Sequence, residues 1–278
     1  KVRYIEHVGE HFAVAGPHLV QPSPQRTPVL FQAGSSDAGR AFAAKHAEAI
    51  FVGGWDIESY RRNVADVRRR AVENGRDAHD VKAYAMAAVV VGRTREAAER
   101  KLEQLNALSR AEGYLAHLGG IGVDLASYPR STKLSEIVAK ERSAGRDKSV
   151  RSRFFDSEQT VGEALERLTR LDRGPFFAVG TPVEVADAIE GWVRDTDLDG
   201  FNLQQILTPG TAEDFIELVV PELQRRGLYR TRYEESTLRE RLFGKGRSRL
   251  PGTHPGARYR GGANLGIEDV PTDLAGAR

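Results

Sequence analysis

The sequence contains no cysteine, and it has no long apolar run. Without cysteine, disulfide bridges, thiolate metal ligands and cysteine nucleophiles are all excluded. No secretory signal peptide or membrane-spanning segment is visible, so we expect no membrane partner. The composition is compatible with a reducing compartment, and we expect a cytoplasmic protein.

Neither sign of charge dominates the chain. The 41 Lys and Arg residues nearly balance the 39 Asp and Glu residues, which leaves a formal net charge of +2. A nucleic-acid surface needs concentrated positive charge, so we expect no nucleic-acid partner. With 40% hydrophobic residues, the 278-residue chain can bury a sizeable core. Small molecules and other protein chains remain as the expected partners.

Two site patterns are also missing. The chain has no G-x-G-x-x-G fingerprint for a nicotinamide dinucleotide. His7 and His11 resemble a ligand pair, but no further ligands stand near them in the sequence, and metal sites need more partners. We therefore predict no metal site and interpret both histidines as surface or structural residues.

The sharpest pattern is the stretch PQRTPVLFQAGSSDAGRAFAAKHAE, residues 24–48. Its apolar residues 29–31 predict a strand buried on both faces of an α/β sheet. The small residues Ala33, Gly34, Ser35 and Ser36 then form a turn before a helix, which Ser36 or Asp37 can cap. A helix N-terminus carries partial positive charge and unpaired N–H donors, so this arrangement suits an anion such as phosphate. Taken alone, however, a Gly-Ser-Ser tripeptide is more often a tight turn with a capping serine.

The surrounding residues favour the site. HVGEHFAVAGPHLVQPSPQ followed by PVLFQAGSSDAGRAFAAKHAEAIF resembles one group of the bacterial-luciferase-like flavin monooxygenases, the nitrilotriacetate, dibenzothiophene-sulfone and long-chain alkane monooxygenases. The resemblance resumes at residues 181–201, 220–223 and 227–231, so it covers most of residues 6 to 243.

This resemblance implies a (β/α)₈ TIM barrel of the α/β class, reduced FMN as cofactor, and a QAG-x-S serine that binds the flavin phosphate. That role falls on Ser36, with Ala33, Gly34 and Ser35 beside it. The implied activity is the oxygenation of a small organic substrate with O₂, the reduced FMN being supplied by a separate flavin reductase. The absence of a nicotinamide fingerprint agrees with a separate reductase.

In the resembling enzymes the QAG-x-S strand lies midway round the barrel, whereas here it lies near the start of a chain that opens on Lys1. We therefore expect only the C-terminal half of the barrel, in residues 1–243, followed by a flexible tail in residues 244–278. Four parallel strands are predicted near residues 28–33, 49–53, 81–91 and 200–206. Open strand edges need a cover, so we expect a homo-oligomer or another covering chain.

Residues 113–173 interrupt the alternation of strand and helix, and they are too long for an ordinary barrel connection. By resemblance they form an insertion near the barrel mouth, a candidate lid over flavin and substrate. His117, which stands close to glycines, is its candidate catalytic residue, because histidine can donate a hydrogen bond to a substrate oxygen. A structural histidine is the alternative.

Several local signals complete the expectations. Asn74-Gly75 predicts a helix end, Thr160 and Thr181 each predict a capping-box start, and Pro221 predicts a kink or a restart in the last helix. The arginine run at residues 68–70 reads as a solvated face.

Polar residues near the end of the chain leave two choices open. Asn202, Gln204 and Gln205 either face a ligand or satisfy groups at the rim of the barrel. Thr208, Gly210 and Thr211 offer a rival phosphate site after the last strand. Two other functions also fit the chain: a deazaflavin-dependent oxidoreductase on the same barrel, and an inactive barrel remnant that binds partners.

Overall fold

The structure is a computed structural model, and it describes residues 4, 6–119, 123–146 and 158–259. The chain forms two compact units. The first comprises Lys1–Gly53, Arg61–Tyr84 and Arg232–Arg278, and the second comprises Gly54–Tyr60 and Ala85–Thr231.

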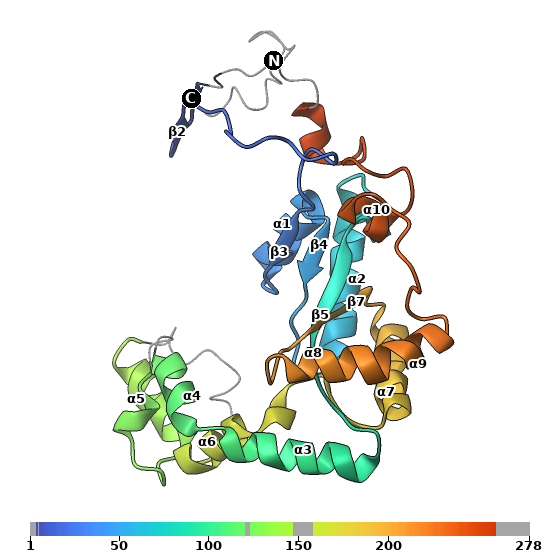
Figure 1. The fold of residues 1–278 in the computed structure, drawn as a ribbon. Coiled ribbons are helices and arrows are strands. Elements are labelled where there is room, and N and C mark those ends of the chain that lie inside the picture. The colour runs from blue at the N-terminus through green and yellow to red at the C-terminus, as the bar shows by residue number, and fades with distance from the viewer. Residues whose placement is uncertain (1–3, 5, 120–122, 147–157, 260–278) are drawn as a thin grey trace. The chain divides into compact units, whose positions relative to one another are not determined.

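The first unit contains the N-terminal hairpin, three parallel strands, two long helices and the C-terminal segment (Figure 1). Its elements are β1 (His7–Val8), β2 (Ala13–Val14), β3 (Phe31–Ala33), α1 (Asp37–His46), β4 (Ala49–Phe51), most of α2 (Ile57–Glu73), the 3₁₀ turn η1 (Ala78–Asp80), the start of β5 (Lys82–Val91), α10 (Leu238–Phe243) and the 3₁₀ turn η7 (Pro255–Tyr259).

The strands of this unit pair in parallel, as the sequence predicts. Phe31 lies opposite Ala49 in the β3–β4 pair, and Ala49 lies opposite Lys82 in the β4–β5 pair. Helices α1 and α2 supply the crossovers that parallel neighbours require. By contrast, the short strands β1 and β2 pair antiparallel and form an N-terminal hairpin.

The two faces of this sheet differ in exposure. Ile50 and Ala83 are fully or almost fully buried, whereas Phe31 is 46% exposed and Phe51 is 38% exposed. The rings of Phe31, Phe51 and Tyr84 contact one another across the three strands, with centroids 5.7 to 6.4 Å apart. The sequence predicts that the strand containing Phe31 is buried on both faces. This prediction is wrong for Phe31, because the described residues leave the aromatic face of the sheet open to solvent.

The second unit contains the end of β5, two further strands and most of the helices. Its remaining elements are α3 (Arg95–Leu108), α4 (Ala111–Gly119), the 3₁₀ turn η2 (Leu125–Ser127), α5 (Leu134–Ser143), α6 (Val161–Thr169), the 3₁₀ turn η5 (Leu171–Arg173), β6 (Phe177–Gly180), α7 (Pro182–Thr196), β7 (Gly200–Leu203), α8 (Gly210–Asp214), a π-helical turn (Phe215–Val219) and α9 (Val220–Arg225).

Strand β6 pairs in parallel with the end of β5, and β7 also pairs with β5. The four predicted strands are present as β3, β4, β5 and β7, and β6 is an additional strand that the count of four left out. Val89 and Val91 of β5 pack with Ala178, Val185 and other buried residues of this unit in one apolar core.

The predicted helix signals are confirmed where the structure describes them. Thr160 and Thr181 each form a capping box with the glutamate three residues later. Helix α2 ends at Glu73, just before Gly75, whose φ of 72° suits glycine. The helix that begins with α8 passes through the π-helical turn and restarts as α9 at Val220, one residue before Pro221.

The predicted insertion is helical in its described part. Helices α4, α5 and α6, drawn in green to yellow in Figure 1, share a small core built around Leu125, Leu134, Ile137, Val161 and Leu165. The preceding helix α3 ends at Leu108, because Ser109 takes an extended conformation. Residues 120–122 and 147–157 of the insertion lie outside the described residues.

The first part of the predicted tail is held by contacts within the first unit. Arg247 forms an ion pair with Asp80 at 2.6 Å, and Nε2 of His254 lies 3.0 Å from the carbonyl oxygen of His46. Leu250 is also buried. Residues 260–278 lie outside the described residues, and for them the flexible tail stays a prediction.

Candidate anion-binding turn

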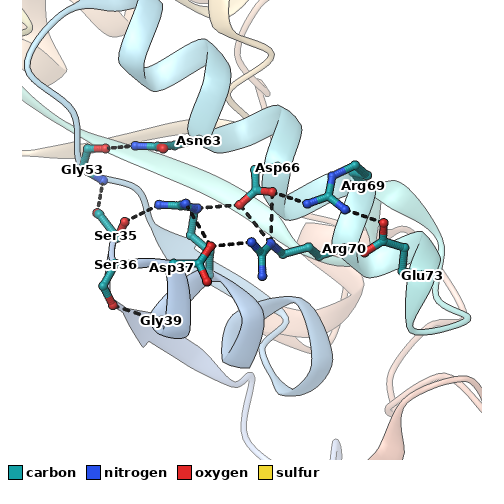
Figure 2. Close-up of polar contacts among 11 residues, drawn as sticks. Ser35, Ser36, Asp37, Gly39, Gly53, Asn63, Asp66, Arg69, Arg70 and Glu73 are labelled. Atoms are coloured by element: carbon teal, nitrogen blue, oxygen red, sulfur yellow. Dashed lines mark hydrogen bonds and ion pairs between the residues drawn. The ribbon is translucent and has the colours of Figure 1, made fainter.

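The candidate site is the QAGSS turn, residues 32–36, which joins the carboxyl end of β3 to the N-terminus of α1. Ser36 is the N-cap of α1, and its Oγ accepts a hydrogen bond from the Gly39 N–H at 3.1 Å (Figure 2). The Ser36 side chain is exposed. Its hydroxyl hydrogen can therefore still be donated to a ligand while the oxygen caps the helix.

Gly39 lets the helix approach the turn closely. A Cβ at this position would lie 2.8 Å from the Gly34 carbonyl oxygen, so a larger residue would push the first turn of α1 away. The N–H groups of the first turn of a helix have no acceptor within the helix. Because the turn and the helix lie so close together, backbone N–H donors and the Ser36 hydroxyl gather at the N-terminus of α1.

Ser35 links the turn to the end of β4. Its Oγ accepts from the Gly53 N–H at 2.7 Å, and Nδ2 of Asn63 donates to the Gly53 carbonyl oxygen at 2.8 Å (Figure 2). A Cβ at Gly53 would lie only 2.6 Å from Ser35 Oγ. Helix α2 thus holds the Ser35 side chain through Asn63 and Gly53.

A second connection runs through Arg40. Its Nη1 donates to the Ser35 carbonyl oxygen, and its Nε donates to Asp66 on α2 at 2.6 Å. Asp66 also accepts from Arg69 and Arg70 (Figure 2). Helix α2 therefore holds the turn indirectly: Asn63 contacts Gly53, which donates to the Ser35 hydroxyl, and Asp66 contacts Arg40, which donates to the Ser35 backbone carbonyl.

The charge of Asp37 in the first turn of α1 is compensated. Arg70 forms an ion pair with its carboxylate, and Nη2 of Arg40 lies 3.6 Å from the same oxygen. An uncompensated carboxylate at this position would repel a bound anion. The two arginines reduce that repulsion, and the turn remains suited to an anion.

Asp66 is strongly acidic in this network. Burial alone would raise its pKa, but the hydrogen bonds from Arg40, Arg69 and Arg70 outweigh burial and lower the pKa to about 2. The carboxylate is therefore ionised at neutral pH and holds all three guanidinium groups.

The reading of residues 68–70 as a solvated face is therefore wrong for two of the three arginines. Arg68 is buried and donates to the Ala78 carbonyl oxygen at 3.2 Å, and Arg70 joins the network that compensates Asp37. Arg69 is the most exposed of the three. Arg68 and Arg70 are thus positioned by contacts with residues distant in the sequence rather than by exposure to water.

Gln32 carries an unsatisfied group beside the turn. Its Nε2 donates to the Ala33 carbonyl oxygen at 3.1 Å, whereas Oε1 is buried and has no partner among the described residues. A buried carbonyl without a donor is costly, so a bound ligand or a further chain segment that supplied an N–H would be favoured here.

The other residues that the sequence suggests for a site lie outside the QAGSS turn. His117 lies in helix α4 rather than in a loop, and its side chain is not among those that the structure describes. Asn202, Gln204 and Gln205 have exposed side chains, and the Gln204 N–H donates to the Ala87 carbonyl oxygen at 2.8 Å.

The polar groups of the rival phosphate site after β7 are less available to a ligand than those of the QAGSS turn. Thr211 is buried, and its hydroxyl oxygen accepts from the Leu207 N–H at 2.9 Å. Helix α8 has only five residues before the π-helical turn. The helical backbone continues through this turn into α9, so the two sites differ in their available polar groups rather than in helix length.

The described residues show neither a metal site nor a membrane-spanning helix. His7 and His11 are exposed, and no three His, Asp or Glu side chains of the described residues group as a metal site. In the same part of the chain, no helix is long and apolar enough to cross a bilayer.

Fold and turn together define an α/β protein with parallel strands and an exposed, capped helix N-terminus at the carboxyl end of β3. The sequence model of the luciferase-like monooxygenases matches residues 2–199. A long-chain alkane monooxygenase of Geobacillus thermodenitrificans (strain NG80-2) is 47% identical over 263 residues, which are 94% of this chain and 54% of that protein.

Two solved structures agree with this match. A long-chain alkane monooxygenase superposes with a TM-score of 0.79 at 46% identity, over 94% of this chain and 55% of that chain. A riboflavin lyase, solved with a modified FMN and riboflavin, has a TM-score of 0.76 at 38% identity, over 92% of this chain and 56% of that chain.

The chain belongs to the luciferase-like monooxygenase family. It spans about half the length of the curated relatives it matches. The predicted fold class, a (β/α)₈ barrel represented by about half of its length, is confirmed by the superposition.

Sequence reasoning missed the residues that hold the turn: Arg40, Gly53, Asn63 and Asp66. Only Gly53 carried a signal, because a glycine directly after a strand marks a close backbone approach. The other three lie on helices, where their spacing alone does not say which loop they reach.

Proposed function

We propose that the chain is part of a flavin-dependent monooxygenase that holds the phosphate of reduced FMN at the QAGSS turn. The proposal rests on one observation: Ser36 caps an exposed helix N-terminus at a strand end, with the neighbouring Asp37 compensated by arginine. Ser36 and the backbone of Gly34 and Ser35 would bind the phosphate, and Ala33 would border it.

The family membership supports flavin as the ligand, and the riboflavin lyase among the similar structures was solved with a modified FMN. Bound reduced flavin would supply the electrons for O₂ and the transfer of one oxygen atom to a small organic substrate, with water as the other product. The protein's part would be to bind the phosphate, orient the cofactor and exclude water.

The wider assignments belong to the same proposal. We infer a two-component system in which a separate flavin reductase delivers reduced FMN, as the resemblance to the flavin monooxygenases implies; the lack of a nicotinamide fingerprint in this sequence agrees with it. A homo-oligomer in the cytoplasm and a catalytic role for His117 complete it.

The phosphate assignment is tested by replacing Ser36 and its rival Thr208. Ser36→Ala removes a hydrogen bond to a charged group, so FMN affinity should fall roughly ten- to a hundredfold. Thr208→Ala should change it much less. Fluorescence titration with FMN measures both. Unchanged affinity in Ser36→Ala with a large loss in Thr208→Ala would place the phosphate after β7 instead.

A further inference from the structure

The second unit contains a cavity of about 360 Å³, and none of its lining residues belongs to the QAGSS turn. Its walls come from the end of β5, from helix α3, and from the segment that leads from β7 into α8. Binding sites for small organic molecules measure roughly 300–1,000 Å³. The cavity is therefore large enough for such a molecule.

The walls are mainly apolar. Val90 and Val91 are buried at the base, and Leu105 of α3 is half-buried in the wall. Leu108 and Leu207, which also line the cavity, are 71% and 50% exposed. Large apolar side chains in contact with water gain free energy when an apolar ligand covers them. The lining thus favours an apolar partner over water.

The charges in the cavity cancel. Lys101 and Asp214 are the only charged residues among the described lining residues, and they form an ion pair with each other. Nζ of Lys101 also donates to the Val91 carbonyl oxygen at 3.2 Å. A charged ligand would have to compete with this pair for its counter-charge, whereas a neutral ligand would not.

Polar groups at the cavity are few. Gln104 contributes an amide, and Thr211 contributes a hydroxyl whose oxygen already accepts from the Leu207 N–H. The Thr211 hydroxyl can still donate its hydrogen, and the Gln104 amide can donate or accept. A molecule with one polar atom on an apolar body would match this set.

We propose that this cavity is a binding site for a neutral, largely apolar small organic molecule, which packs against Val90, Leu105 and Leu207. The site is separate from the flavin phosphate and does not depend on the proposed function. Its test contains no flavin, so a failure here leaves the phosphate assignment standing.

The test uses two fluorescent probes that differ by one sulfonate group. N-phenyl-1-naphthylamine is neutral, and 1-anilinonaphthalene-8-sulfonate is its anionic counterpart. Titration of the 278-residue chain should show saturable binding of the neutral probe and weaker binding of the anionic one. Leu207→Asp, which places a carboxylate at the cavity, should weaken the neutral probe roughly ten- to a hundredfold.

Leu228→Asp is the matched control, because Leu228 is 48% exposed, lies in the same unit and does not line the cavity. It should change probe affinity by about twofold at most. Circular dichroism confirms that both variants are folded. Equal losses in the two variants, or no binding of the neutral probe, would overturn the site. Tighter binding of the anionic probe would overturn the neutral class of ligand.

Discussion

Arg239 and Glu48 form a buried, two-pronged ion pair. Nε and Nη2 of Arg239 donate to the two carboxylate oxygens of Glu48 at 2.7 and 2.9 Å, and their side chains are 1% and 2% exposed. Arg239 also donates to the carbonyl oxygens of Thr27 and Pro28, and Glu48 accepts from the Leu30 N–H. The pair therefore fastens α10 to the amino ends of β3 and β4.

Removing one partner of this pair should destabilise the first unit strongly. Arg239→Ala leaves Glu48 buried without a counter-charge, and such a loss typically costs about 3–5 kcal/mol. Urea denaturation measures the free energy of unfolding.

Arg241→Ala on the same helix is the control, because Arg241 is exposed, and it should cost less than about 1 kcal/mol. The double variant Arg239→Met with Glu48→Met should recover much of the loss, since it leaves no unpaired charge. Equal losses in Arg239→Ala and Arg241→Ala would contradict the central role of the pair.

The two serines of the turn should separate stability from binding. Ser35→Ala leaves the Gly53 N–H without its acceptor, which costs about 1–3 kcal/mol if the group stays buried. Ser36→Ala removes only a helix cap, at a cost of about 1 kcal/mol. We expect thermal unfolding to rank Ser35→Ala as the less stable variant, while FMN titration ranks Ser36→Ala as the weaker binder. If Ser35→Ala were both the less stable variant and the weaker binder of FMN, Ser36 would act only through the stability of the fold.

The Asp66 network predicts a dependence of stability on pH. Its pKa is lowered from 3.8 to about 2 in the folded protein, so the unfolded chain takes up the proton first as the pH falls. The stabilisation, on the order of 2 kcal/mol, is complete above pH 3.8 and is lost as the pH falls through about 2. Urea denaturation between about pH 5 and pH 2 should show the difference between wild type and Asp66→Asn shrinking. A constant difference across this range would show that Asp66 acts through packing rather than charge.

Local signals in the sequence were reliable where one short segment decides the structure. Thr160 and Thr181 cap their helices because the hydroxyl and the glutamate three residues later satisfy N–H groups of the same turn. Pro221 interrupts its helix because it has no N–H and its ring crowds the preceding turn. These interactions span few residues, so their patterns can be read directly.

The contacts of the arginine run and of Phe31 could not be predicted in this way. Arg70 reaches Asp37 across 33 positions of sequence, and Arg40 reaches Asp66 across 26. Period and composition indicate which residues face outward from a helix, but not which loop lies there. The exposure of Phe31 likewise depends on what covers the sheet, which strand patterns do not specify.

By itself, the sequence determined the order of strands and helices and the caps of the helices, and it marked the QAGSS turn as the candidate place for an anion, because each follows from the chemistry of neighbouring residues. The resemblance of separated segments fixed the family. The tertiary structure decided how the turn is held, through Arg40, Asn63 and Asp66, and that Asp37 is compensated. It also decided where α10 is anchored and which apolar residues enclose the cavity. All of these depend on distances between residues far apart in the chain, and only folding sets such distances.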